Sequence, residues 1–302
     1  MPFKEFTAIL NPKSRKIVVG IALNAIGGGM TLSLLLVYLH DMRGFTNTFG
    51  GFLLSWGALV SIVASTPMGA LVDRIGPKRV MTAGLVLNSV AAFSLSLVTT
   101  HLHAIAAVTA INIAGQAIWP SQSVILTRVT PEAHRQKIFA FNFMLLNLGL
   151  GIGGVISSLI IQSGSLRSFQ IMYWVDGATF LLYFAIVLSM HGEGLDKYVP
   201  QPHEPKQGSY RDLFAIKPLM LLGIGGIILF TFGYGVIQAG IPIYATQFLG
   251  LSPKWLGVIF GVNTFAIVTL QPLVMRIIEK YSKYKALIAI GLIWAISWLF
   301  VG

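Results

Sequence analysis

The stretch that decides the fold runs from Gly69 to Met81 and reads GALVDRIGPKRVM. It joins two long apolar runs, Phe52 to Met68 and Thr82 to Val98, which are long enough to cross a bilayer as helices. Because Gly76-Pro77 breaks a helix and reverses the chain, the stretch predicts a tight turn between two membrane spans. Its arginines and lysine are the residues that a cytoplasmic loop collects. Asp73 differs from them, since a lone carboxylate beside a membrane is costly unless it is paired.

The composition of the whole chain is that of a membrane protein. Hydrophobic residues make up 55% of the 302 residues and charged residues only 10%, whereas soluble domains carry about 25% charge. With a mean hydropathy of +0.77, most of the chain needs the bilayer as its solvent. The absence of cysteine excludes disulfides, thiolate metal sites and cysteine nucleophiles.

No arrangement of residues indicates catalysis or metal binding. The histidines lie mostly in predicted loops, and no pair of them has the spacing of metal ligands on a helix. The sequence also lacks a serine-histidine-aspartate set, a phosphate loop and paired carboxylates. We therefore expect no enzyme, no catalytic residue, no cofactor and no metal.

Nine apolar segments are long enough to span a bilayer, and one polar stretch interrupts them. That stretch, residues 191–217, is rich in proline and glycine and predicts a flexible cytoplasmic linker. The expected organisation is all-α, with a six-helix bundle over residues 1–190, the linker, and an incomplete three-helix bundle over residues 218–302. The expected spans cover, approximately, residues 17–40, 46–72, 79–99, 104–127, 138–162, 168–190, 218–245, 254–278 and 286–302.

The basic residues predict the orientation of these spans. With the N-terminus inside, 18 of the 21 Lys and Arg residues fall on the cytoplasmic side, which is a strong positive-inside pattern. Lys13, Arg15 and Lys16 precede a first span that is too long for a signal peptide, so we expect an uncleaved helix. The net charge of +11 is then explained by topology and by anionic headgroups rather than by nucleic acid. We expect a multi-pass protein of the plasma (inner) membrane.

The stretch also has the spacing G-x-L-x-D-R-x-G-x-[KR]-[KR], which closely resembles the signature loop between helices 2 and 3 of the major facilitator superfamily. The resemblance implies two helical bundles that rock about a central cavity. It also implies a conformational switch in this loop, where Asp73 contacts the other bundle and holds the outward-open arrangement. The switch residues are Gly69, Asp73, Arg74, Gly76, Lys78 and Arg79.

The end of the chain departs from the family's six-plus-six design. The sequence stops in the ninth span, without a polar tail. We expect a truncated or fragmentary member of the family, and the alternative is a natural product of nine helices.

Asp176 is the acidic residue that lies well inside a predicted span. Charged groups within a bilayer often mark functional sites. Asp176 is therefore either a protonatable group that carries a coupling proton or a carboxyl that holds helix packing by a hydrogen bond beside Gly177. Similar stretches in helix 6 look like those of drug-efflux members of the family.

The fifth predicted span is rich in glycine. Small residues at such spacing let two helices approach closely. The run resembles the glycine-rich helix 5 motif of antiporters in the family, although Ile152 follows Gly151 where that motif has proline. The residues expected to pack helices are Gly149, Gly151, Gly153 and Gly154.

Polar and aromatic residues within several spans are candidates for a substrate cavity. They carry no fixed charge, which suits neutral or amphipathic cationic organic solutes. Each could equally form a hydrogen bond between helices. Helix 4 offers such residues in place of the arginine that helps proton transfer in many proton-coupled members. The candidates are Asn24, Asn112, Gln116, Trp119, Tyr234, Gln238 and Asn263.

The resulting expectation is a secondary active transporter of small organic solutes, of the proton-coupled drug-efflux type. Its expected partners are a small-molecule substrate, protons and the lipid bilayer, with no nucleic acid, and it is expected to be a monomer. The alternatives are a transporter for uptake of a sugar or metabolite, and a non-transporting fragment or membrane scaffold.

Overall fold

The computed structural model confirms the expected all-α fold. It describes residues 9–31, 34–161, 165–192, 194–197, 210–231, 244, 249–250, 254–278 and 280–300, and within these ranges it contains helices and no strands. Tyr234 and Gln238, two of the candidate cavity residues, lie outside them.

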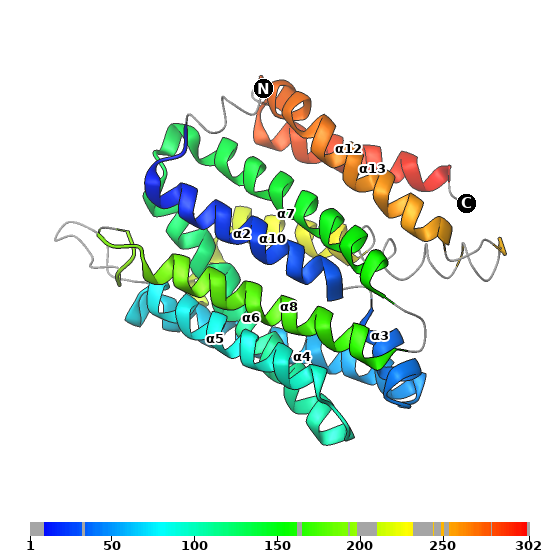
Figure 1. Ribbon diagram of the computed structural model, residues 1–302. Helices are drawn as coiled ribbons and strands as arrows, with labels where there is room; N and C mark the ends of the chain where they lie inside the picture. Colours follow the sequence, from blue (N-terminus) through cyan, green and yellow to red (C-terminus); the bar gives the residue numbers. More distant parts are fainter. Residues whose placement is uncertain are drawn as a thin grey trace. The chain divides into compact units, whose positions relative to one another are not determined.

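The chain divides into two compact units. One comprises Met1–Tyr198 with Ile267–Pro272, and the other comprises Val199–Ala266 with Leu273–Gly302. Figure 1 shows the helices of the chain, coloured along the sequence. The helices of the early chain are α2 (Pro12–Thr31), α3 (Leu35–Val37), the π-helix η1 (Tyr38–Met42), α4 (Asn47–Ile75), α5 (Pro77–Ser96), α6 (His101–Val129), α7 (Glu132–Ile160) and α8 (Leu166–Leu188). Those of the later chain are α9 (Tyr210–Ala215), α10 (Lys217–Leu229), α12 (Lys254–Ile278) and α13 (Lys283–Leu299).

Several of these helices are suited to a bilayer. Among the described residues, the five helices α4 to α8 are long and apolar enough to cross a membrane. A sixth span results if α2 and the segment Leu35–Met42, which are inclined by 43°, count as one. These two pieces cover the first expected span, residues 17–40, except for residues 32–34, of which 32–33 lie outside the described residues.

The expected spans over residues 46–72 and 79–99 leave residues 73–78 for the turn, and in the structure the turn is shorter. Helix α4 continues through Asp73 and Arg74 to Ile75, and α5 begins at Pro77, so Gly76 alone separates the two helices. Gly76 has a φ of 95°, which a residue with a side chain rarely adopts. Pro77 suits the first position of a helix because its missing N–H would have no partner there.

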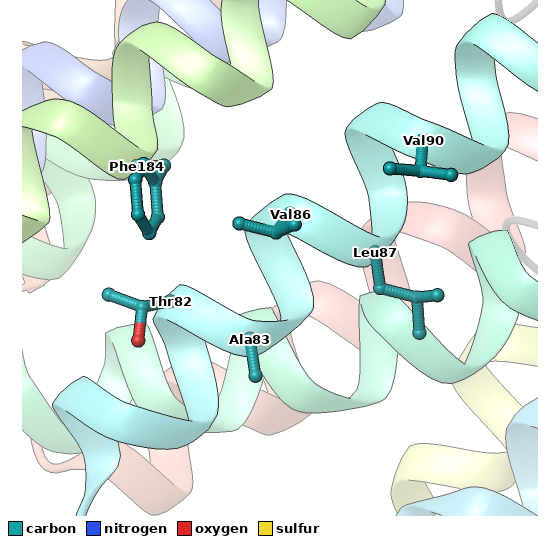
Figure 2. Close-up of a pocket in the computed structure, with 6 residues that line it drawn as sticks. All are labelled: Thr82, Ala83, Val86, Leu87, Val90 and Phe184. Carbon is teal, nitrogen blue, oxygen red and sulfur yellow. The ribbon is translucent and has the colours of Figure 1, made fainter.

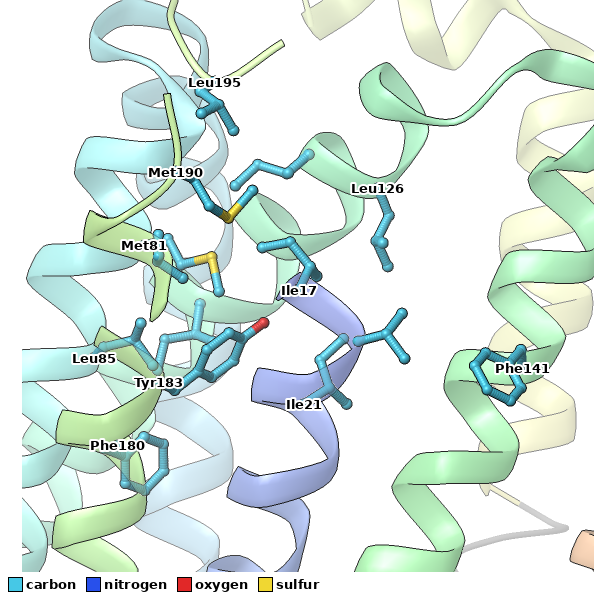
Figure 3. Packing of buried hydrophobic residues seen from close by; sticks show 14 of the residues in the cluster. Ile17, Ile21, Met81, Leu85, Leu126, Phe141, Phe180, Tyr183, Met190 and Leu195 are labelled. Carbon is cyan, nitrogen blue, oxygen red and sulfur yellow. The ribbon is translucent and has the colours of Figure 1, made fainter. Parts of the chain in front are cut away.

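We call the unit that contains Met1–Tyr198 the early unit. Helix α8 forms its centre. It packs against α2 and α5, while α2 also packs against α7, and α6 packs against α4 and α5. Figure 3 shows the apolar cluster at one end of these helices, where Tyr183 of α8 lies among Ile17 and Ile21 of α2 and Met81 and Leu85 of α5. These side chains are all buried, so this cluster holds three helices together.

The opposite end of α5 is held by side chains from other helices. The Tyr38 hydroxyl contacts the carbonyls of Leu95 and Ser96 at 2.9 Å and accepts a 2.7 Å hydrogen bond from Arg43 Nε. Trp174 Nε1 of α8 donates to Ser96 Oγ at 2.8 Å. The Tyr38 contacts thus supply a partner to carbonyl groups at the end of α5.

Candidate functional site

The turn at Gly76 is covered by the segment that follows α8. We call residues 189–192 and 194–197 the α8 tail. The Lys78 backbone N–H donates to the Leu195 carbonyl at 3.2 Å. Lys78 Nζ donates to the carbonyl of Leu188 at 3.1 Å and to that of Met190. A methyl group on Gly76 would lie 2.6 Å from the backbone nitrogen of Lys197, so only glycine fits this approach.

The other expected switch residues do not join this contact. Asp73, Arg74 and Arg79 are exposed. The Asp73 carboxylate forms no hydrogen bond or ion pair with another described residue. A methyl group on Gly69 would meet open space. The structure therefore joins Gly76 and Lys78 to the α8 tail and leaves the charged side chains around them accessible.

Basic residues from two more helices hold the α8 tail. Lys16 Nζ of α2 donates to Ser189 O at 3.0 Å and to Ser189 Oγ at 2.9 Å. Arg128 of α6 donates to the Asp196 carbonyl at 2.8 Å. The tail therefore ties together the ends of α2, α5 and α6, and cations near the C-terminus of α8 also suit the direction of its dipole.

Asp176 lies between α8 and α2, with only 7% of its surface exposed. The Thr31 hydroxyl donates to its Oδ2 at 3.2 Å, while its Oδ1 is buried and has no hydrogen-bond partner among the described residues. No cation forms an ion pair with it among the described residues. Oδ2 therefore makes a hydrogen bond between α2 and α8, whereas Oδ1 is an exception to the rule that buried polar atoms are paired.

Two further side chains complete the polar group around Asp176. Thr179 Oγ1 donates to the Asp176 carbonyl at 2.7 Å and accepts a 3.3 Å hydrogen bond from Asn24 Nδ2. A methyl group on Gly27 would lie 2.8 Å from Asp176 Oδ1. The half-buried candidate cavity residue Asn24 is therefore linked through Thr179 to the backbone of the candidate coupling residue Asp176.

The remaining cavity candidates of the early unit share one face of α6. Asn112, Gln116 and Trp119 are four and three residues apart, which aligns them on a helix. Asn112 accepts a hydrogen bond from Ser61 at 2.9 Å. Trp119 is 51% exposed, and Gln116 is half-buried with no hydrogen bond to a described residue. Asn263 is exposed on α12, in the other unit.

Two of the four glycines of α7 face α2 at close range. A methyl group on Gly149 would lie 2.6 Å from the Ala25 side chain, and one on Gly153 would collide with the Ile26 carbonyl. Gly154 has open space where a side chain would be. Gly151 is half-buried on the same helix.

Sequence reasoning missed the hydroxyl partners of these groups. Thr31 and Thr179 bind the Asp176 group, and the Tyr183 hydroxyl donates to Gln122 Oε1 at 3.1 Å in the interior. Hydroxyl residues are common in spanning helices, so composition gives no signal that selects these. Within the described residues, no group of three or more His, Asp or Glu side chains could hold a metal ion.

Comparison with known proteins identifies the family. A family model described as the Major Facilitator Superfamily matches residues 17–302. The chain therefore belongs to the Major Facilitator Superfamily, as its signature loop predicts. Its curated relatives are named as transporters and a resistance protein, which agrees with a transporter rather than an enzyme.

Three curated relatives illustrate the similarity. The chain is 22% identical over 294 residues to the MFS-type transporter YqjV of Bacillus subtilis, covering 95% of this chain and 70% of that protein. It is 25% identical over 289 residues to the MFS-type transporter YttB of the same organism, covering 93% and 70%. It is 22% identical over 244 residues to the quinolone resistance protein NorA of Staphylococcus aureus, covering 76% and 57%.

Solved structures support the fold. A bacterial homologue of the human drug peptide transporters PepT1 and PepT2 matches with a TM-score of 0.54 and 19% identity, covering 78% of this chain and 56% of that one. The peptide transporter POT matches with a TM-score of 0.54 and 15% identity, covering 84% and 57%. The chain thus spans a little over half the length of these structures and is an integral, multi-pass membrane protein of their fold.

Proposed function

We propose that this protein is a secondary active transporter that exports small organic solutes by alternating access, with protons as the coupling ion. Family membership supports transport. The similarity to a quinolone resistance protein supports an amphipathic organic solute as the substrate. We place the transporter in the plasma membrane as a monomer with its N-terminus in the cytoplasm, because 18 of its 21 Lys and Arg residues then face inward.

The observation that carries proton coupling is the environment of Asp176. It is the buried acid among the acidic residues that the structure describes. Within the described part of the chain, its Oδ1 has no hydrogen-bond partner, and its Oδ2 accepts from the neutral Thr31 hydroxyl. Because burial disfavours a charge without a counter-ion, this carboxyl can accept and release a proton as the water around it changes.

Thr31 links the charge of Asp176 to the end of α2. Its hydroxyl has one proton and two acceptors within reach, Asp176 Oδ2 at 3.2 Å and the Gly28 carbonyl at 3.3 Å. A charged carboxylate attracts this proton more strongly than a neutral carboxyl does. Protonation of Asp176 therefore releases Thr31 toward the backbone of α2, and the last turn of that helix is free to rearrange.

The substrate face lies on α6 in this proposal. Gln116 offers hydrogen-bonding groups and Trp119 an exposed aromatic ring, and neither carries a charge. An aromatic face attracts organic cations. An amphipathic cation such as ethidium is therefore a suitable first test substrate.

The test reconstitutes the purified 302-residue chain into liposomes with an acidic lumen and follows ethidium fluorescence. We expect accumulation above that of protein-free liposomes, abolished when nigericin collapses the pH gradient. Asp176→Asn should lose this accumulation because asparagine cannot carry the proton. It should keep exchange of ethidium across the membrane without a gradient, since the substrate face on α6 is unchanged.

Asp41→Asn is the matched control, because Asp41 is an exposed acid, and it should behave like the wild type. Accumulation equal to that of empty liposomes in the wild type would overturn the transport proposal. Gradient-driven accumulation that survives Asp176→Asn would overturn the coupling role of Asp176 alone.

A further inference from the structure

A cavity of about 430 Å³ opens between the beginning of α2 and the end of α8. It is separate from the Asp176 group and from the α6 face. Its lining combines two cations, Arg15 and Lys16, with apolar side chains. The lining residues are Leu10, Pro12, Arg15, Lys16, Val19, Ile186 and Ser189.

The two cations of this cavity have donors to spare. The Arg15 side chain is exposed and forms no hydrogen bond or ion pair with a described residue, so its guanidinium retains all five N–H groups. Lys16 uses two donors on Ser189 O and Ser189 Oγ, which leaves one of the three on its ammonium group. These bonds also hold the Lys16 ammonium at the mouth of the cavity. No acidic residue lies in this first turn of α2.

Apolar side chains lie one helical turn further along the same helices. Val19 follows Arg15 by four residues on α2 and is 45% exposed. Ile186 precedes Ser189 by three residues on α8. One turn corresponds to a depth of about 5.4 Å. The cavity thus presents positive charge at the level of the headgroups and apolar surface at the level of the acyl chains.

We infer that this cavity binds one anionic glycerophospholipid, with its phosphate on Arg15 and Lys16 and an acyl chain along Val19 and Ile186. Basic pockets between spanning helices have the chemistry that recognises such headgroups. The Ser189 hydroxyl does not donate to the phosphate, because its proton is used on the Ile186 carbonyl at 2.7 Å. This inference does not depend on whether the protein transports a solute.

A second groove is apolar and has no charged lining residue, so it serves as a comparison for the basic cavity. It lies between α5 and α8 and has a volume of about 560 Å³ (Figure 2). Its lining residues are Thr82, Ala83, Val86, Leu87, Val90 and Phe184, none of them charged. It can hold an acyl chain but offers nothing to distinguish one headgroup from another.

The experiment titrates lipid onto the purified chain in detergent and measures thermal unfolding. The probes are dioleoylphosphatidylglycerol, dioleoylphosphatidylcholine and inorganic phosphate. We expect saturable stabilisation by phosphatidylglycerol and little by the other two. Arg15→Gln should raise the half-saturating phosphatidylglycerol concentration about fivefold, since one cation near a membrane surface contributes about 1 kcal/mol to such binding.

Arg74→Gln is the matched control, because it removes an exposed cation that lies outside the cavity, and its half-saturation should equal that of the wild type. Val19→Asn is a second variant and should weaken binding through the acyl chain. Equal stabilisation by phosphatidylcholine would overturn the inference in favour of an annular lipid. Equal stabilisation by inorganic phosphate would reduce the cavity to an anion site. An equal loss in Arg74→Gln would indicate a general effect of net charge.

Discussion

Gly153 brings the backbones of α2 and α7 together. A side chain at this position would collide with the Ile26 carbonyl and lie 2.9 Å from Gly29 Cα. In a bilayer, helices gain little from burying apolar surface against each other, so such close approach is what holds them. Gly154, the next residue along α7, has no atom near the place where its side chain would be.

This pair of glycines gives a prediction with an internal control. Gly153→Ala should lower the stability of the folded protein by about 1–3 kcal/mol, because one additional carbon must force the two helices apart. Gly154→Ala adds the same carbon into open space and should leave stability unchanged or slightly higher. The melting temperature of the purified protein in detergent measures both. Equal melting temperatures for the two variants would contradict the close approach of α2 and α7.

At the scale of elements, α8 and the tail after it organise one end of the early unit. Lys16 and Lys78 donate to carbonyls at the end of α8, and Gly76 lies against the backbone of the tail. The tail in turn is fixed by Arg128. Lys16 and Lys78, which belong to the basic residues that predict topology, thus also donate hydrogen bonds to the last carbonyls of α8.

Gly76→Ala tests the fit between the turn and the tail. The added methyl group would lie 2.6 Å from Lys197 N, and the φ of 95° would become strained. We expect the tail to detach and trypsin to cleave after Lys197 several times faster than in the wild type. Gly69→Ala, whose methyl group meets open space, should be cleaved at the wild-type rate. Equal cleavage of both variants would show that Gly76 does not hold the tail.

At the scale of the whole molecule, the exposed Asp73 is the residue that tests the switch implied by the family. Asp73→Asn removes the charge without altering a contact of a described residue. We expect correct membrane insertion with a transport rate lowered at least about fivefold, the effect of losing a coupling of about 1 kcal/mol between two states. Ethidium transport in proteoliposomes measures it. Glu132→Gln, which also neutralises an exposed acid, is the control, and a wild-type rate in Asp73→Asn would refute the switch role.

Much of the fold followed from local patterns. Apolar length predicted the spans that α4 to α8 form, and the spacing from Gly69 to Arg79 predicted the family that the match over residues 17–302 confirms. The extent of the turn was wrong, because Gly76 with Pro77 suffices to separate two helices and the residues before it continue α4.

The candidate site was only partly accessible to such reasoning. Asp176 stood out because a carboxyl in an apolar segment is rare. Its partners could not be recognised in the sequence. Thr31 is 145 residues away in the chain, and a threonine is not unusual in a spanning helix. The spanning helices are apolar around most of their surface, so their sequence does not reveal which face meets which neighbour.

The sequence by itself determined that this is a membrane protein, because that depends on local hydropathy. It also determined the distribution of the basic residues and, through a short signature, the family. Only the tertiary structure decided which groups meet: Asp176 with Thr31, Gly153 with α2, and Gly76 with the α8 tail. The physical reason is that helix rotation and docking arise from contacts between residues more than a hundred positions apart, and such contacts leave no periodic mark on the chain.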